Sequence, residues 1–203
     1  MLRRINRLNE EISRWAFEIL FKQNKKWIIA FTNPTAGPWK TIKADSLSNG
    51  KNGEVYRFIL EEDRPDIIMY NDELKAVIIF EAKDSLVKLT DKTQYKKSAD
   101  VVIKLSKILY EKRNNEFWKG RENYKVILGL LWGANDEHEK IVDIYNLFDL
   151  YQSLVTKEKR VFSNVVVGVE TLYKNDSLKC YFYSKSYDED SKPFSTKIID
   201  SLK

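Results

Sequence analysis

The sequence predicts an α/β domain in which a mixed β-sheet is flanked by α-helices. Segments with helical spacing of apolar residues alternate along the chain with short runs rich in β-branched and aromatic residues. Two such runs, 64–70 and 75–83, are joined by the turn-like residues 71–74, which predicts an antiparallel hairpin. The strand-like runs over 75–83, 124–132 and 165–169 are separated by helix-length segments, so this side of the sheet is expected to be linked by crossovers.

The first third of the chain predicts a helix, two strands and a long loop. Apolar residues recur at intervals of three and four over about the first twenty residues, as in an amphipathic helix. A short strand is expected over 26–31, because the two prolines and the glycine within 33–38 must end it. Residues 40–53 are rich in Ser, Asn, Gly and Lys and predict a loop, and the alternation over 54–60 predicts a strand.

The remainder of the chain predicts two helices and three strands. In chain order these are a helix over 90–113, a buried strand over 124–132, a helix over 141–154, and strands over 165–169 and 178–183. Residues 174–177 contain Asn and Asp and predict the turn between the last two strands. The polar residues 189–203 are expected to be a flexible, loosely held tail.

Composition predicts one domain over 1–203, with its core at roughly 54–135. A hydrophobic share of 43% excludes disorder of the whole chain. A single cysteine excludes an internal disulfide, and a single histidine excludes a His-rich zinc site. No apolar run approaches the length of about 18 residues that spans a bilayer, so we expect a cytoplasmic protein with no membrane partner.

The net charge of +5 is modest, but the excess lysines are clustered. Lys92, Lys96 and Lys97 stand near the start of the predicted helix over 90–113 and are candidates for binding the phosphates of DNA. Trp39, in the Pro/Gly-rich segment, is a candidate for ligand contact. The alternative for each basic cluster is a solvated helix face or loop.

Two carboxylates are predicted to meet at one edge of the hairpin. Asp66 starts the first strand and Glu81 ends the second, so antiparallel pairing returns one beside the other. Side chains alternate along a strand, which places Glu81 and Lys83 on one face. The Ala82 side chain then points to the other face, and only its backbone carbonyl faces the pair. The alternative is a solvated strand end at Glu81 and Lys83, with Asp66 as a turn residue.

This cluster suits phosphodiester hydrolysis. Mg²⁺ prefers hard oxygen ligands, so the candidate metal ligands are Asp66, Glu81 and the Ala82 carbonyl. The metal would lower the pKa of a bound water and neutralise charge on the leaving oxygen. Lys83 would orient the attacking water or stabilise the charged transition state, which completes a candidate catalytic set of Asp66, Glu81 and Lys83.

The same residues carry a family resemblance. Pro65-Asp66, fourteen intervening residues and then Glu81-Ala82-Lys83 resemble the motif of the PD-(D/E)xK nuclease superfamily, which includes many type II restriction endonucleases, Holliday-junction resolvases and repair nucleases. The resemblance implies a restriction-endonuclease-like core of a helix, a short mixed sheet and a second helix. It also implies Mg²⁺ dependence and cleavage that leaves a 5′-phosphate.

Members of this superfamily often add another active-site carboxylate from the first helix. The resemblance therefore makes Glu11 and Glu18 candidates, and Glu54, which follows Gly53, is a third. Each has the alternative of an ordinary surface charge.

The expected function is that of a Mg²⁺-dependent, sequence-specific double-stranded DNA endonuclease of the type II restriction class. One active site per chain and two strands to cut predict a homodimer. One alternative is a structure-specific nuclease, such as a junction resolvase or a repair nuclease. The alternative from another class is a non-catalytic nucleic-acid-binding subunit whose acidic cluster is structural.

Overall fold

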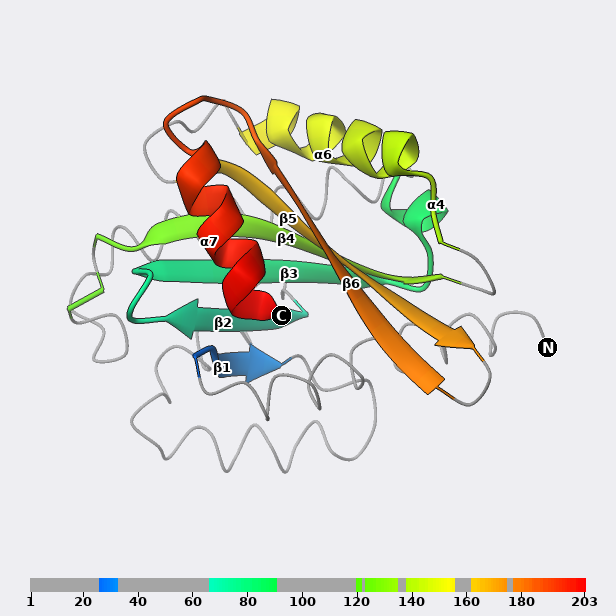
Figure 1. Cartoon of the computed structure of the whole chain (residues 1–203), viewed down its shortest axis with the longest axis horizontal. Coiled ribbons are helices and arrows are strands. Elements are labelled where there is room, and N and C mark those ends of the chain that lie inside the picture. The colour runs from blue at the N-terminus through cyan, green and yellow to red at the C-terminus, as the bar shows by residue number, and fades with distance from the viewer. Residues whose placement is uncertain are drawn as a thin grey trace, which may run out of the picture.

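The computed structural model describes residues 26–32, 66–90, 120–121, 123–134, 138–155, 162–174 and 177–203. These residues form one six-stranded sheet and three helices (Figure 1). The strands are β1 (Ile28–Thr32), β2 (Ile67–Asn71), β3 (Ala76–Lys83), β4 (Lys125–Ala134), β5 (Phe162–Lys174) and β6 (Ser177–Ser186). The helices are α4 (Leu86–Leu89), α6 (Ile141–Val155) and α7 (Lys192–Leu202). The α/β class predicted from the sequence is confirmed.

The strands lie in the sheet in the order of the chain, from β1 to β6. β1, β2 and β3 are antiparallel neighbours, β3, β4 and β5 run parallel, and β6 returns antiparallel to β5. The predicted hairpin is confirmed, with Ile67 opposite Phe80 and Asn71 opposite Ala76. The sheet is therefore mixed, and α6 lies on the connection between the parallel strands β4 and β5.

The turn between β2 and β3 is fixed by side chains. The backbone N–H of Leu74 donates to Asn71 Oδ1 at 2.8 Å, as in an Asx turn. Lys75 then takes a left-handed conformation with φ 49° and returns the chain into β3. Arg121 Nε donates to Asp72 Oδ1 at 2.9 Å and Tyr124 Oη donates to the same oxygen at 2.7 Å. These bonds tie the turn to the start of β4.

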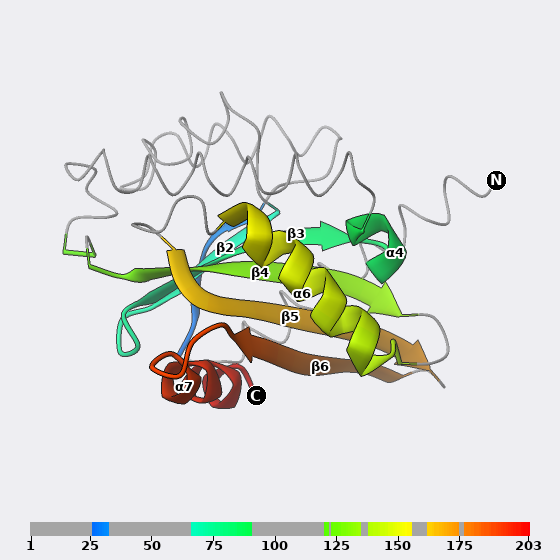
Figure 2. The ribbon, with the colours of Figure 1, turned by 90° about the horizontal axis from the view of Figure 1, so that it is seen from above.

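Two apolar layers cover the sheet. α4 and α6 pack on the face reached by Ile79, Leu128 and Trp132, which we call the α6 face. α7 packs on the opposite face, reached by Ile78, Ile127 and Val167, which we call the α7 face (Figure 2). Both faces of β3 and β4 are thereby buried, as expected for central strands of near-continuous apolar sequence.

The tail predicted over 189–203 is wrong, because most of it forms α7. Ser195, Ile198, Ser201 and Leu202 are buried, and Trp27 Nε1 donates to Ser201 Oγ at 2.9 Å. Only one narrow side of the helix is apolar, which lowers the mean hydropathy of the segment and explains the prediction of a tail.

The last two strands are longer than predicted. β5 has 13 residues rather than the expected run over 165–169, and β6 has 10. The prediction ended this strand before Glu170 and Thr171 because both are polar, yet both are buried within β5. The short helix α4 was not predicted. The expected helix in about the first twenty residues, the loop over 40–53 and the strand over 54–60 lie outside the described residues. So does the expected helix over 90–113, except for Thr90, which is the C-cap of α4.

Replacement of a buried α7 side chain tests whether this helix belongs to the core. We expect Ile198→Ala to lower the free energy of unfolding by about 2–5 kcal/mol, because Ile198 is fully buried against the α7 face. Lys197→Ala, on the exposed side of the same helix, should change it by less than about 0.5 kcal/mol. Urea unfolding measures both. Equal, small effects would show that α7 does not contribute to the core.

The turn between β2 and β3 predicts a pH effect. The hydrogen bond from Arg121, followed by that from Tyr124, holds the pKa of Asp72 below its ordinary value despite slight burial. Because the folded-state pKa is lowered, ionised Asp72 adds stability above its unfolded pKa of about 4, and this is lost as pH falls through the folded-state pKa. Asp72→Asn should cost less than about 1 kcal/mol at pH 7, since the carboxylate is half exposed.

Unfolding of the two proteins as a function of pH measures this contribution, with the exposed neighbour Glu73→Gln as control. The difference between Asp72→Asn and the wild type should vanish at strongly acidic pH. A difference that persists unchanged at acid pH would contradict the assignment.

Candidate active site at the carboxyl ends of the parallel strands

The hairpin brings Asp66 and Glu81 together. Asp66 directly precedes β2, and its backbone N–H donates to the Phe80 carbonyl at 3.1 Å. Its Oδ2 accepts the backbone N–H of Ala82 at 2.8 Å, which extends the pairing of the two strands by one further bond. The register of Ile67 with Phe80 places Asp66 at the position opposite Glu81. Both carboxylates are buried, with 6% and 7% of the residue exposed.

Lys83 completes this cluster from the same strand. Its Nζ lies 2.5 Å from Glu81 Oε1 and donates to the Ala82 carbonyl at 2.8 Å. The Ala82 side chain packs on the α7 face, so only its backbone turns toward the pair, as predicted. One ammonium thus contacts a carboxylate oxygen and a carbonyl oxygen that are both candidate metal ligands.

The position of the cluster follows from the burial of β3. The run from Ala76 to Phe80 is fully buried, which fixes β3 in the centre of the sheet. Pairing with β4 continues through Glu81, Ala82 and Lys83, opposite Leu130, Leu131 and Trp132. The polar residues at the end of β3 are therefore held within the sheet rather than in a frayed end. In parallel sheets this carboxyl end is the usual place for ligands.

Asp84 is a buried carboxylate that the sequence did not single out. It follows Lys83 directly, and Lys88 Nζ donates to its Oδ2. Its Oδ1 is buried and has no hydrogen-bond partner among the described residues. The described residues contain no group of three or more His, Cys, Asp or Glu side chains placed to hold a metal ion. The candidate ligand set predicted from the sequence has two such side chains, Asp66 and Glu81, together with the Ala82 carbonyl.

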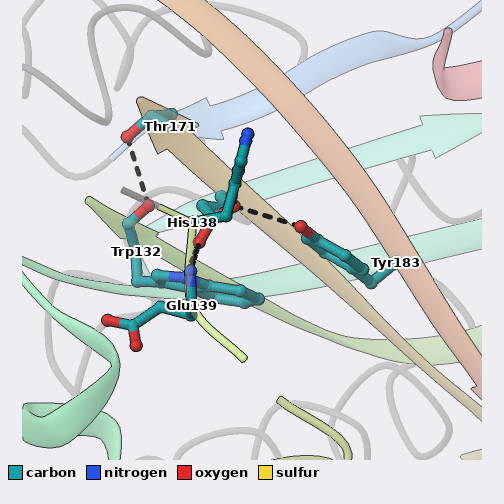
Figure 3. A network of polar contacts seen from close by, with 6 residues as sticks. Trp132, His138, Glu139, Thr171 and Tyr183 are labelled. Carbon is teal, nitrogen blue, oxygen red and sulfur yellow. Dashed lines mark hydrogen bonds and ion pairs between the residues drawn. The ribbon is translucent and has the colours of Figure 1, made fainter. Parts of the chain in front are cut away.

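A second polar cluster, also missed from the sequence, surrounds Glu170 on β5 (Figure 3). The Glu170 side chain is fully buried. Oε1 accepts the backbone N–H of Glu139 at 2.8 Å and Trp132 Nε1–H at 3.4 Å. Oε2 accepts Tyr183 Oη–H at 3.0 Å and lies 2.8 Å from His138 Nδ1. Each carboxylate oxygen thus has two partners.

The buried carboxylate affects the ionisation of its neighbours. Burial, and then the proximity of Glu170, raises the pKa of Tyr183, so this phenol stays protonated and acts as a donor. Burial, followed by Glu170 and Asp143, also raises the pKa of the Glu139 carboxyl group. Negative charge on Glu170 therefore disfavours a second negative charge nearby.

The two clusters lie on the same face and at the same end of the sheet. Lys83 is in register with Trp132 on β4, and Trp132 is in register with Glu170 on β5. Residues in register on neighbouring strands point to the same face, so all three side chains lie on the α6 face. Two strand spacings separate Lys83 from Glu170 at the backbone, or about 10 Å. The candidate site thus extends over the ends of β3, β4 and β5.

The other predicted site residues lie outside the described part of the chain. These are the extra-carboxylate candidates Glu11, Glu18 and Glu54 and the DNA-contact candidates Trp39, Lys92, Lys96 and Lys97.

No protein-family model, curated protein or solved structure matches this chain. Among the described helices, none combines the length and the apolar character needed to cross a bilayer.

The hydrogen bonds around Glu170, which we call the Glu170 network, predict a large effect on stability. We expect Glu170→Ala to lower the free energy of unfolding by about 3–5 kcal/mol, because it removes the acceptor of the buried Trp132 Nε1–H and of the part-buried donors of Tyr183 and Glu139. Glu189→Ala, an exposed carboxylate before α7, should change it by less than about 1 kcal/mol. Chemical unfolding measures both. If Glu170→Ala lowers the free energy of unfolding as little as the control does, these hydrogen bonds do not stabilise the fold.

Proposed function

We propose that this protein is a Mg²⁺-dependent endonuclease that hydrolyses the phosphodiester bonds of double-stranded DNA and leaves 5′-phosphates. The observation that carries the proposal is the buried group formed by Asp66, Glu81, the Ala82 carbonyl and Lys83. Its residues are the ones that resemble the PD-(D/E)xK motif, and they lie at one end of the central strand β3 and beside it.

The architecture supports the same proposal. The superfamily resemblance implies a core of a helix, a short mixed sheet and a second helix. Asp66 directly precedes β2, and Glu81 and Lys83 lie on β3, which pairs antiparallel with β2. β4 runs parallel to β3, and helices pack on both faces. This arrangement agrees with a restriction-endonuclease-like core.

The residues of the cluster fit Mg²⁺. Two carboxylates and a backbone carbonyl are hard oxygen donors, and Mg²⁺ binds through one or two carboxylates while it retains waters and contacts substrate phosphate. Asp66 and Glu81 would hold the ion through their side chains and Ala82 through its carbonyl. When bound, Mg²⁺ supplies a water of lowered pKa and a positive charge beside the phosphoryl oxygens.

Lys83 and Asp66 have separable tasks. The ammonium of Lys83 contacts Glu81 Oε1 and the Ala82 carbonyl, so it is held where it orients an attacking water or stabilises the charge that develops on the phosphate. Asp66 is fixed by the bond from the Ala82 N–H to its Oδ2. That bond sets the direction of the carboxylate before any ligand binds, which is the pre-organisation that catalysis requires.

Within this chemistry we favour a sequence-specific enzyme of the type II restriction class. The long strands β5 and β6 add to the hairpin and β4 and supply more structure than hydrolysis needs, which suits a chain that also reads bases. Cutting both strands of a duplex with one site per chain calls for a homodimer with a two-fold axis. The expected location of such an enzyme is the cytoplasm.

One observation favours a second candidate, a non-catalytic nucleic-acid-binding subunit. The ion pair between Lys83 and Glu81 closes part of the cluster without a metal ion. In that case the cluster is structural, DNA binding is independent of Mg²⁺, and Asp66→Ala leaves the function intact.

Substitution of the cluster tests the proposal. We expect Asp66→Ala, Glu81→Ala and Lys83→Ala each to lower the rate of Mg²⁺-dependent DNA cleavage by at least about 100-fold while DNA binding is retained. The measurement is digestion of unmethylated phage DNA in Mg²⁺ and in EDTA, read on a gel. Asp200→Asn and Lys192→Ala, exposed charges on α7, are matched controls that should cleave like the wild type.

The cleavage pattern also separates the candidates. Discrete Mg²⁺-dependent fragments indicate a sequence-specific endonuclease, and a smear indicates a non-specific or structure-directed nuclease. Cleavage that survives any of the three substitutions refutes the site assignment. Binding without cleavage by the wild type favours the non-catalytic subunit.

A further inference from the structure

The Glu170 network supplies a histidine with a fixed orientation. Backbone and indole N–H groups can only donate, so the contacts from Glu139 and Trp132 identify Glu170 Oε1 as an acceptor. Tyr183 donates to Oε2, which is also the oxygen that faces His138 Nδ1. The carboxylate therefore favours a proton on Nδ1 of His138. This directs the chemistry of the ring to its other nitrogen, Nε2.

The His138 ring lies at the surface although its partner is buried. Its side chain is 45% exposed, whereas that of Glu170 is fully buried. The edge-to-face contact with Tyr181, at 4.1 Å between ring centroids, restrains the plane of the imidazole. A buried carboxylate thus positions a solvent-facing histidine. Stability alone does not require this arrangement, because a buried acid can be satisfied by neutral donors.

The histidine stands beside the candidate active site. His138 lies between the end of β4 and the start of α6, and it contacts Glu170 two strands from Lys83 on the α6 face. A nucleic-acid backbone that places one phosphate at Glu81 and Lys83 has further phosphates within reach of the neighbouring strand ends. Contacts to such phosphates fix the register of the substrate.

We infer that His138, oriented by Glu170, binds a phosphate of the DNA backbone that flanks the phosphate cleaved at the Asp66 and Glu81 site. The inference rests on the proposed nuclease function and adds a substrate-positioning residue to it. With both ring nitrogens protonated, Nδ1–H donates to Glu170 and Nε2–H donates to the phosphate in a charge-assisted hydrogen bond. In the neutral ring Nε2 offers a lone pair, which repels the phosphate oxygens.

The other ionisable groups near the ring also favour phosphate binding at lower pH. Glu170 on β5 and Glu139 before α6 oppose a bound phosphate, and Asp143 lies in the first turn of α6. Tyr181 and Tyr183 face the ring and the carboxylate from β6, and burial, followed by the proximity of Glu170, raises the pKa of Tyr183. Burial raises the pKa of Glu139, so acidification also removes one repelling charge. DNA affinity should therefore fall as pH rises.

The single histidine of the chain permits a direct test. The C2–H proton signal of His138 is followed by NMR from pH 5 to 8, with and without a short duplex DNA, in EDTA so that no cleavage occurs. We expect DNA to raise the titration midpoint of this signal by about 0.7 pH unit, which by linkage equals about fivefold tighter binding to the protonated form.

A binding assay with variants provides a second test. Fluorescence anisotropy with the same duplex should show an affinity that declines about fivefold from pH 5.5 to 8 for the wild type and far less for His138→Gln. Lys140→Ala, the adjacent exposed charge, is the matched control and should weaken binding equally at every pH. Because the NMR experiment uses the wild-type chain, it decides the question even where His138→Gln fails to fold.

The outcomes separate this inference from the proposed function. A raised midpoint together with loss of the pH dependence in His138→Gln supports it. Mg²⁺-dependent cleavage with an unchanged midpoint overturns the role of His138 and leaves the nuclease assignment intact. Absence of both DNA binding and cleavage overturns both.

Discussion

The structure depends on the burial of the apolar part of β3. This strand pairs antiparallel with β2 on one side and parallel with β4 on the other, and apolar layers cover both of its faces. Every apolar side chain from Ala76 to Phe80 is removed from water, which supplies a large part of the hydrophobic stabilisation of the sheet. The same pairing extends to Lys83 and holds the polar end of the strand inside the fold. Polar groups in such a place are costly unless they are hydrogen-bonded or bind a ligand, and Asp66, Glu81 and Lys83 all have hydrogen-bond partners there.

The two clusters at this end of the sheet stabilise their buried carboxylates with different partners. Glu81 lies against an ammonium, and Asp66 accepts a backbone N–H, which leaves a group of oxygen atoms suited to a cation. Both oxygens of Glu170 accept hydrogen bonds from neutral donors, and Oε2 also contacts the exposed His138 ring and orients it. The first arrangement suits hydrolysis, and the second suits positioning of a substrate. Their common face, linked by the register of Lys83, Trp132 and Glu170, makes them parts of one functional surface in our account.

The sequence predicted those parts of the fold and site that depend on neighbouring residues in the chain. The apolar run before Glu81, the Asn71 turn and the alternation around Ala82 were enough to place Asp66, Glu81 and Lys83 together, because a hairpin relates residues that are close in the chain. The contact between His138 and Glu170 joins residues 32 positions apart on separate elements, and no local pattern signals it. Glu170 also ended the predicted strand, because a charged residue usually marks the edge of an apolar run. The helix α7 escaped prediction because its buried positions include the serines 195 and 201, which are satisfied by hydrogen bonds.

The central claim is that Asp66, Glu81 and the Ala82 carbonyl form a metal site. Diffraction from crystals soaked in Mn²⁺, recorded at a wavelength where manganese scatters anomalously, tests it most directly, because Mn²⁺ takes the same hard oxygen ligands as Mg²⁺. Our account predicts an anomalous peak in contact with both carboxylates and the carbonyl, with Lys83 displaced from Glu81 or retained beside the ion. The peak should be lost in Asp66→Asn. Well-ordered crystals with no peak at this position in saturating Mn²⁺, and with the Lys83–Glu81 ion pair unchanged, would contradict the account.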